Sequence, residues 1–238
     1  MGNTRMGRWA ILGILAPAMV VVCEAQQSGV SERTVADTIR LSRSSVQAHN
    51  VEIEEVIYGG RRAVRVTEHP GESPGPAIAI LPSTDFAEGT IEIDVAGTPR
   101  AGADSALRGF VGIAFHVAPG AAAFRAFYLR PTNGRATDQL RRNHATQYIA
   151  MPDFPWHRLR REEPGVYESY VDLEAGAWTK LRIEVSQGRA MLFVHGAAQP
   201  SLIVNDLKTG VPRGQIALWI GLGTEAYFGD AIVTRRRQ

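Results

Sequence analysis

The feature that most constrains the fold of this chain is an alternation of apolar and polar side chains with a period of two, which begins at Val51. Residues 51–55 follow this pattern, and a Gly59-Gly60 pair then leads into a second alternating segment at residues 62–67. Two such segments joined by a glycine turn are typical of a β-hairpin. Because an amphipathic helix has a period of 3.6 residues, the pattern favours strands over helices.

The same pattern recurs in short segments along the rest of the chain, separated by turns rich in Pro, Gly or Asp. In residues 178–185, Leu181, Ile183 and Val185 point one way, to the predicted core, and the charged side chains between them point the other way. About a dozen short strands without a long helix predict an all-β fold, a two-sheet antiparallel β-sandwich (jelly roll) in one domain. The further predicted strands are residues 77–81, 90–95, 109–117, 124–129, 146–150, 166–172, 190–195, 202–204, 215–220 and 226–233.

The predicted sandwich occupies residues 46–234, and its flanks differ from it in composition. Residues 26–45 are polar with a weak helical pattern at 35–41, which predicts an arm or one short helix. Residues 235–238 form a basic tail that we interpret as solvated. One domain fits a chain of 238 residues, since all-β sandwiches often reach this size.

Residues 1–25 have the organisation of a secretory signal peptide. Arg5 and Arg8 precede an apolar run at residues 9–22, and small residues stand at the positions read by a signal peptidase that cleaves after Ala25. The run is short for a bilayer span and no stop-transfer segment follows, so we expect no membrane span in the mature chain. This pattern predicts an exported protein, periplasmic or extracellular.

Cys23 is the only cysteine of the chain, and cleavage after residue 25 would remove it. The mature domain would then have no disulfide or thiolate chemistry, and the burial of apolar area alone would hold it together. The alternative is a lipoprotein acylated at Cys23. Against this alternative, Val22 stands where a small residue normally precedes an acylated cysteine.

Charge and ligand patterns exclude several classes of function. Lys and Arg together number 26 against 24 Asp and Glu, so the net charge is +2 and no strong positive field is available to gather nucleic acid. The six histidines are scattered and no acidic calcium-binding loop is found, so we predict no metal site and no cofactor. A structural calcium bound by backbone carbonyls stays open.

Six strand motifs carry a family resemblance: GTIEIDV (89–95), GFVGIAF (109–115), WTKLRI (178–183), AMLFVHG (190–196), GQIAL (214–218) and AYF (226–228). Their order resembles the concanavalin A-like lectin and glucanase superfamily, which has a LamG-like jelly-roll fold. The closing motifs are also similar to the 3-keto-disaccharide hydrolase-like domain family. The first resemblance implies a carbohydrate ligand, and the second implies cleavage of an oxidised glucoside.

The densest group of polar and aromatic side chains lies between Arg130 and Arg161. Long excursions between strands are usually functional or mobile. Sugars need aromatic rings for their C–H faces and amide, guanidinium or carboxylate groups for their hydroxyls. The alternative is an ordinary solvated surface braced by arginine–carboxylate pairs. The candidate substrate-binding residues are Arg130, Asn133, Arg142, Gln147, Tyr148, Trp156, Arg160 and Tyr170.

Glycoside hydrolysis usually needs two carboxylates, and the candidate catalytic residues are Glu168, Asp172 and His144. Glu168 and Asp172 share a face of the predicted strand at 166–172. Four residues along a strand span roughly 13 Å, so each carboxylate needs a partner from another strand. His144 or His116 could supply the general base.

Three hypotheses of function follow from these patterns. The first is a carbohydrate-binding jelly roll, which is favoured by the fold resemblance and the polar and aromatic excursion. The second is a glycoside-cleaving enzyme, favoured by the carboxylates and histidine near the same segment. The third is a non-catalytic envelope interaction protein, which the lack of a recognisable catalytic set favours.

Overall fold

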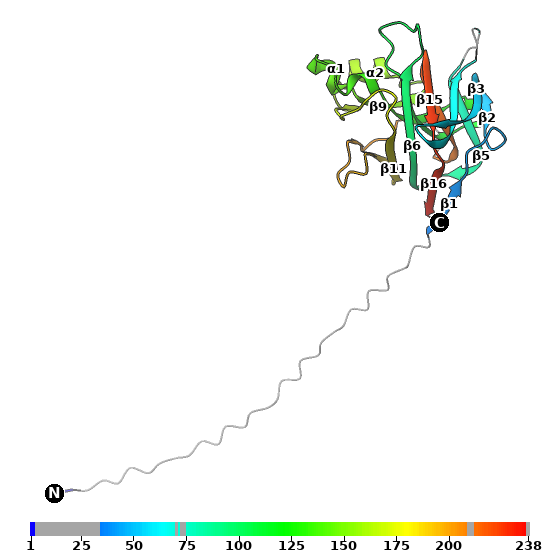
Figure 1. Ribbon diagram of the computed structural model, residues 1–238. Coiled ribbons are helices and arrows are strands. Elements are labelled where there is room, and N and C mark those ends of the chain that lie inside the picture. Colours follow the sequence, from blue (N-terminus) through cyan, green and yellow to red (C-terminus); the bar gives the residue numbers. More distant parts are fainter. Residues whose placement is uncertain (3–33, 70, 72–74, 209–211, 237–238) are drawn as a thin grey trace. The chain divides into compact units, whose positions relative to one another are not determined.

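Segments with β-branched, aromatic and alternating apolar side chains form antiparallel strands throughout the described part of the chain, which is residues 1–2, 34–69, 71, 75–208 and 212–236 of the computed structural model (Figure 1). The predicted signal peptide lies outside the described residues, apart from its first two positions. Glu32–Gln238 forms one compact unit. In the described ranges no helix is long and apolar enough to cross a membrane.

The strands form two sheets, which confirms the predicted all-β antiparallel sandwich. The first sheet has the spatial order β13 (Leu202–Val204), β12 (Arg189–Val194), β11 (Thr179–Ser186), β6 (Gly89–Pro99), β15 (Thr224–Phe228), β4 (Arg61–Glu68) and β3 (Val51–Tyr58), and β16 (Ala231–Arg236) joins β6 to β1 (Thr34–Ile39). The second has the order β10 (Glu168–Ser169), β9 (Thr146–Met151), β8 (Phe124–Leu129), β7 (Val111–Val117), β14 (Gly214–Ile220), β5 (Ala77–Phe86) and β2 (Gln47–His49).

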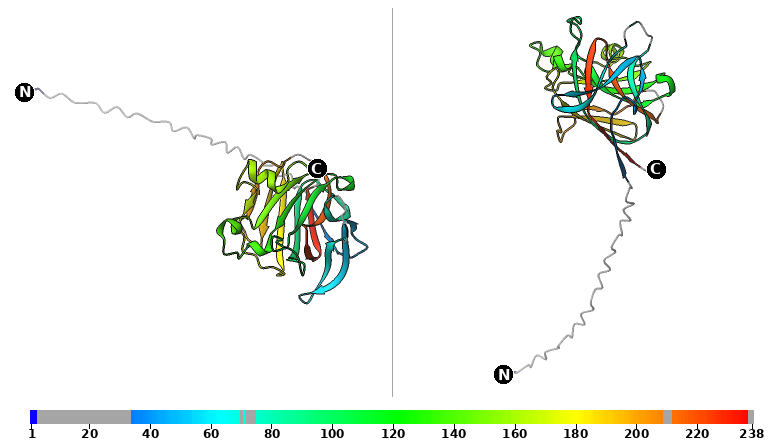
Figure 2. Two further views of the ribbon diagram at one scale, coloured as in Figure 1. Left: turned by 90° about the horizontal axis from the view of Figure 1, so that it is seen from above. Right: turned by 45° about the vertical axis from the view of Figure 1, so that its right-hand side comes forward.

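Short helical segments lie between some of the strands. They are η1 (Pro119–Ala121), η2 (Pro131–Asn133), α1 (Gln139–Asn143) and α2 (Trp156–Glu162). Figure 2 shows the residues of α1 and α2, coloured green to yellow-green, at the edge of the stacked strands. Both α-helices lie in the polar and aromatic excursion between residues 130 and 161, so this excursion is an ordered part of the domain.

The main core lies between the two sheets, and the alternation predicted for β11 is confirmed. Leu181, Ile183 and Val185 are buried in it, whereas Lys180 on the opposite face is exposed. Side chains of both sheets fill the space between them, as expected for two amphipathic sheets that cover each other's apolar faces. The largest buried rings of this core include Phe86, Phe115, Phe127 and Phe228.

A second apolar cluster lies on the outer face of the seven-stranded sheet. Phe127 points into the main core, so its neighbour Tyr128 points to the other face, where it joins this second cluster. The strand registers place six residues in one row across the sheet: Ile78, Trp219, Gly112, Tyr128, Gln147 and Glu168. The row is apolar at one end and polar at the other, and its polar end lies beside α1 and α2 in the candidate site described below.

Gly112 is required where the row passes from β14 to β8. A Cβ atom at this position would lie 2.1 Å from the carbonyl oxygen of Phe127 and 2.6 Å from the Cα atom of Tyr128. With no side chain between them, the rings of Tyr128 and Trp219 stack with centroids 4.6 Å apart. Glycine therefore permits the aromatic contact that supports one end of the polar group.

Both flanks of the sandwich differ from the sequence prediction. Thr34–Ile39 is the strand β1 and not a helix, because it finds a complete antiparallel partner in β16. The pairing extends to Thr34 opposite Arg236, and Arg235 donates to Asp37 at 2.8 Å. The first arginines of the predicted basic tail therefore belong to a strand, and the sandwich begins before residue 46.

Candidate functional site

The candidate site is built on the strand ends of β8, β9 and β10. Tyr128 on β8 lies opposite Gln147 on β9, and Gln147 lies opposite Glu168 on β10, so the three side chains share one face of the sheet. All three are buried, with exposed fractions of 2% for Tyr128, 0% for Gln147 and 6% for Glu168. Buried polar groups of this kind must be hydrogen-bonded to be tolerated, and the partner here is an arginine.

Arg130, immediately after β8, ties the row together from a buried position with 5% exposure. Its Nη1 donates to Glu168 Oε1 at 3.1 Å and to the carbonyl oxygen of His144 at 3.0 Å. Its Nη2 donates to Tyr128 Oη at 2.9 Å and to Gln147 Oε1 at 3.0 Å. Four bonds to a planar guanidinium fix both its position and its orientation, which lysine could not reproduce.

Glu168 is shared by two arginines. Besides Arg130, Arg160 on α2 donates from Nε to Glu168 Oε2 at 2.9 Å and from Nη2 to Glu168 Oε1. The Glu168 side chain is 2% exposed and that of Arg160 is 32% exposed, so α2 reaches from the surface down to a buried carboxylate. The carboxylate is thus held by charge-assisted bonds on both oxygens.

His144 completes the group at the end of α1. Its Nε2 atom lies 3.5 Å from Glu168 Oε2. Burial lowers the pKa of His144, the carboxylate of Glu168 opposes that shift, and the cations Arg160 and Arg130 add to it. The imidazole is therefore neutral at pH 7 and offers one donor and one acceptor.

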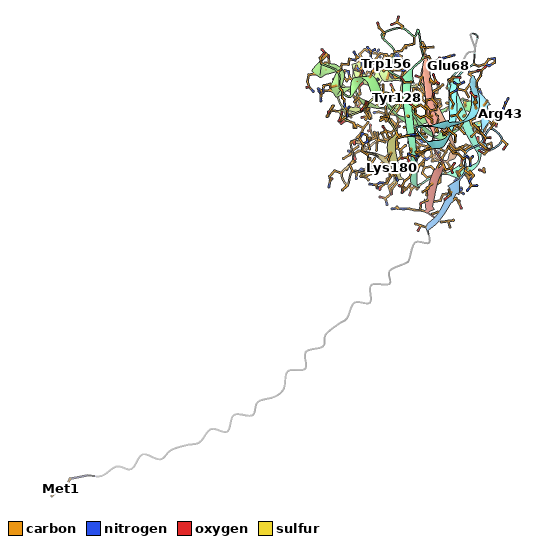
Figure 3. The ribbon with its side chains drawn as sticks, in the orientation of Figure 1. Met1, Arg43, Glu68, Tyr128, Trp156 and Lys180 are labelled. Atoms are coloured by element: carbon orange, nitrogen blue, oxygen red, sulfur yellow. The ribbon has the colours of Figure 1, made fainter. Side chains whose placement is uncertain are left out.

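A groove of about 540 Å³ opens over this group. Trp156, at the start of α2, stands in its wall with 45% of its surface exposed, and the Arg160 guanidinium lies 4.8 Å from the centre of its ring. Tyr128 and Trp156, both labelled in Figure 3, each face Arg130. Burial raises the pKa of Tyr128 to about 12, so its hydroxyl stays protonated at neutral pH. The groove is lined by Ala106, Arg108, Phe110, Tyr128, Arg130, Asn133, Asp138, Leu140, Arg141, His144, Trp156 and Arg160.

The structure brings together most of the residues predicted from the sequence. Asn133 belongs to the same group, because its Nδ2 donates to the carbonyl oxygen of His144 at 3.0 Å and its Oδ1 accepts from Arg141 Nε at 2.9 Å. The predicted residues that meet at the groove or directly beneath it are Arg130, Asn133, His144, Gln147, Trp156, Arg160 and Glu168.

Asp172 does not join this group, so the expected arrangement of Glu168 and Asp172 on one strand is wrong. The strand β10 is only Glu168–Ser169, and the chain beyond it follows a different course. Asp172 is exposed and accepts from Arg135 Nε at 2.9 Å, and this arginine lowers the pKa of Asp172. Glu168 is therefore the predicted catalytic carboxylate that the groove retains.

Tyr148 is also misplaced by the sequence prediction. It follows Gln147 on β9, and because successive side chains of a strand point to opposite faces, only one of the two can face the groove. Tyr148 is fully buried in the main core, where its hydroxyl accepts from the backbone N–H of Lys208 at 3.1 Å. The alternation within β9 was a sufficient signal that both residues could not bind the same ligand.

Arg142 and Tyr170 lie outside the groove lining formed by the described residues. Arg142 Nη2 donates to Tyr170 Oη at 2.8 Å, and its guanidinium lies 4.9 Å from the centre of the tyrosine ring. The bond is exposed, and 41% of the Tyr170 surface is accessible. Arg142 and Tyr170 therefore bond to each other at the surface, apart from the buried group around Glu168.

Several lining residues were missed by the sequence reasoning. Tyr128 shares a strand face with Arg130, and this period-two relation could have identified it. Arg108 and Phe110 come from one segment and Arg141 from another, and no local pattern places these two segments at one groove. Within the described residues, no three His, Cys, Asp or Glu side chains are arranged to hold a metal ion, and this finding does not bear on the open alternative of a structural calcium bound by backbone carbonyls.

Comparisons with known proteins support the fold. No protein-family model matches this sequence, and no curated protein sequence is a significant match. A Bacillus subtilis protein of unknown function with a galectin-like fold is 13% identical with a TM-score of 0.51, over 85% of this chain and 96% of that chain. A prokaryotic β-1,3-1,4-glucanase (lichenase) derived from a mouse hindgut metagenome is 12% identical with a TM-score of 0.50, over 86% of this chain and 99% of that chain.

These likenesses confirm the predicted fold, a two-sheet antiparallel jelly roll. At 12–13% identity they concern the fold alone, since one fold hosts many functions. The similarity to the 3-keto-disaccharide hydrolase-like family stays a prediction. Function must be argued from the groove itself.

Proposed function

We propose that this protein is a carbohydrate-binding jelly roll that holds a saccharide in the groove beside Trp156 and does not cleave it. The observation that carries the proposal is the half-exposed Trp156 ring directly above a buried and fully bonded group of Arg130, Gln147 and Glu168. A sugar presents a C–H face that packs on an aromatic ring and hydroxyls that need polar partners held in place. Both requirements meet in one groove.

The carboxylate arrangement favours binding over cleavage. Glycoside hydrolysis usually uses one carboxylic acid and one carboxylate on either side of the bond. Glu168 is occupied by Arg130 and Arg160 on both oxygens, and Asp172 pairs with Arg135 elsewhere on the surface. Both oxygens of Glu168 thus bond to guanidiniums and Asp172 lies outside the groove, so these two carboxylates do not stand on either side of one bond.

Thermal unfolding against a panel of neutral and acidic oligosaccharides tests the proposal. A ligand that binds only the folded state raises the melting temperature. We expect at least one saccharide to raise it, and mass spectrometry of the mixture to recover that saccharide intact. Release of saccharide fragments would show that the protein cleaves glycosides, and the proposal of binding without cleavage would then be wrong. The absence of any shift would favour the envelope interaction protein and overturn the proposal.

A pair of variants at Trp156 tests whether the ligand binds in the groove. Trp156→Ala removes the ring, and we expect the dissociation constant to rise about tenfold, the effect of a stacking contact of roughly 1.4 kcal/mol. Trp156→Phe keeps a ring at the same position and should retain most of the affinity. Equal affinities for the alanine variant and the unaltered protein would exclude this groove as the binding site.

Export is part of the proposal, because an exported protein meets polysaccharides outside the cell. The support is the sequence pattern of residues 1–25. N-terminal sequencing of the protein recovered from the periplasm or medium should begin at Gln26. A lipid-modified N-terminus at Cys23 would support the lipoprotein alternative, and recovery of the full chain from the cytoplasm would contradict export.

A further inference from the structure

The residues of the groove carry a surplus of positive charge. Four arginines, Arg108, Arg130, Arg141 and Arg160, line it. The carboxylates in the lining or bonded to these arginines are Asp138 and Glu168, which leaves a net charge of +2 for these six residues, and the charge of Asp104 acts on Arg108 from outside the lining. The complete chain of 238 residues also carries a net charge of +2. Positive and negative charges are therefore nearly balanced outside the groove, whereas positive charge prevails inside it.

The four arginines fall into two pairs that differ in their hydrogen-bond partners. Arg130 and Arg160 are bonded to Glu168, which neutralises part of their charge. Within the described residues, neither Arg108 nor Arg141 forms an ion pair with a carboxylate. Neutral oxygens hold both guanidiniums, from Ser105 and Leu107 for Arg108 and from Asn133 and Thr132 for Arg141.

The repulsion between these cations is a further sign that the groove is suited to an anion. Burial lowers the pKa of Arg108, the nearby charges of Arg141 and Arg130 lower it further, and the charge of Asp104 opposes this shift only in part. Like charges held close together by neutral acceptors raise the energy of the empty groove. A negative ligand between them relieves that repulsion and gains charge-assisted hydrogen bonds.

We propose that the saccharide bound here carries a carboxylate, as a uronic acid residue does, and that Arg108 and Arg141 bind this carboxylate while Trp156 packs against the sugar ring. The inference rests on the proposed function, because it names the class of saccharide for the same groove. The planar fork of a guanidinium matches the two oxygens of a carboxylate. The exposed side chain of Leu140, 66% accessible in the same lining, offers a further apolar surface for the sugar.

A matched pair of ligands tests the charge directly. Isothermal titration measures the affinity for uronic acid tetramers of the galacturonate, glucuronate and mannuronate series, and for the methyl ester of each. Esterification keeps the sugar and removes the charge. We expect one acidic tetramer to bind at least tenfold more tightly than its ester, and the difference to shrink as the salt concentration rises. A sulfated tetrasaccharide is the comparison for anions without a planar carboxylate.

Variants of Arg108 and Arg141 test whether these two residues bind the carboxylate of the ligand. Arg108→Gln and Arg141→Gln should each weaken binding of the acidic tetramer at least fivefold and leave binding of the ester within twofold. Arg43→Gln removes the same charge from a surface position well apart from Trp156 in Figure 3, and it should leave both affinities unchanged. Circular dichroism establishes that each variant is folded, and the acid–ester comparison on the unaltered protein holds whether or not a variant folds.

The outcomes separate the inference from the proposed function. Neutral tetramers that bind as tightly as the acids would overturn the uronate inference and leave carbohydrate binding in place. A sulfated ligand that binds more tightly than every uronate would overturn the carboxylate class. Variants at Arg108 and Arg141 with unchanged affinity would overturn the assignment of these residues. No heat or melting shift with any saccharide would overturn both proposals.

Discussion

Replacement of Glu168 by Gln tests how the buried group of the groove is held together. The side chain keeps its size but loses the charge that faces Arg130, whose side chain is 5% exposed. A buried cation without its counter-ion costs about 3–5 kcal/mol of folding free energy. Arg160, at 32% exposure, can turn towards water, so we expect the lower end, about 3 kcal/mol. For a chain of this size that corresponds to a fall of roughly 6–12 °C in melting temperature.

The assay is urea unfolding at pH 7 together with differential scanning calorimetry. Asp172→Asn is the matched control, because it makes the same chemical change in the pair with Arg135, where both side chains are more than half exposed. Solvent screens such a pair, so its melting temperature should change by less than about 2 °C. A Glu168→Gln protein that loses less than about 1 kcal/mol, or no more than the control, would refute the reasoning.

Two further predictions concern the sheet that carries the site. Gly112→Ala forces a Cβ to 2.1 Å from the Phe127 carbonyl, so it should cost about 3 kcal/mol or prevent folding, whereas Gly165→Ala, strained only by its backbone angle, should cost about 1–2 kcal/mol in urea unfolding. Burial lowers the pKa of His116 to about 4, and its Nδ1 faces Arg125 at 2.6 Å. Unfolded protein therefore binds more protons, and stability should fall by roughly 3 kcal/mol as the pH drops from 6.5 to 4. His116→Gln should lose less over this interval, and equal losses would contradict the assignment.

The residues of the candidate site come partly from the seven-stranded sheet and partly from two short helices, and we expect the two parts to affect ligand specificity differently. Tyr128, Gln147 and Glu168 are bonded strand residues and form the floor of the group. Arg160 and Trp156 lie on α2 and are more exposed, so they adapt to a ligand at lower cost. Changes on α2 should therefore alter the preferred saccharide, whereas changes on the floor should alter stability first.

Local sequence was sufficient for the fold class and for the region of the site. Alternation with a period of two depends on neighbours in the chain, and in β11 it correctly separated Leu181, Ile183 and Val185 from the charged face. The segment between residues 130 and 161, with its concentration of polar and aromatic residues, contributes most of the residues that line the groove. Both inferences need only composition and short-range periodicity.

Tertiary structure decided which of these residues meet. The row of Tyr128, Gln147 and Glu168 depends on the registers of β8, β9 and β10, and a shift by one residue would have turned Tyr148 to the groove in place of Gln147. The same holds for β1, whose weak helical pattern gave way to pairing with a strand almost two hundred residues away. Register and pairing are settled by the burial of both sheets at once, and that free energy belongs to the whole domain and to no single segment.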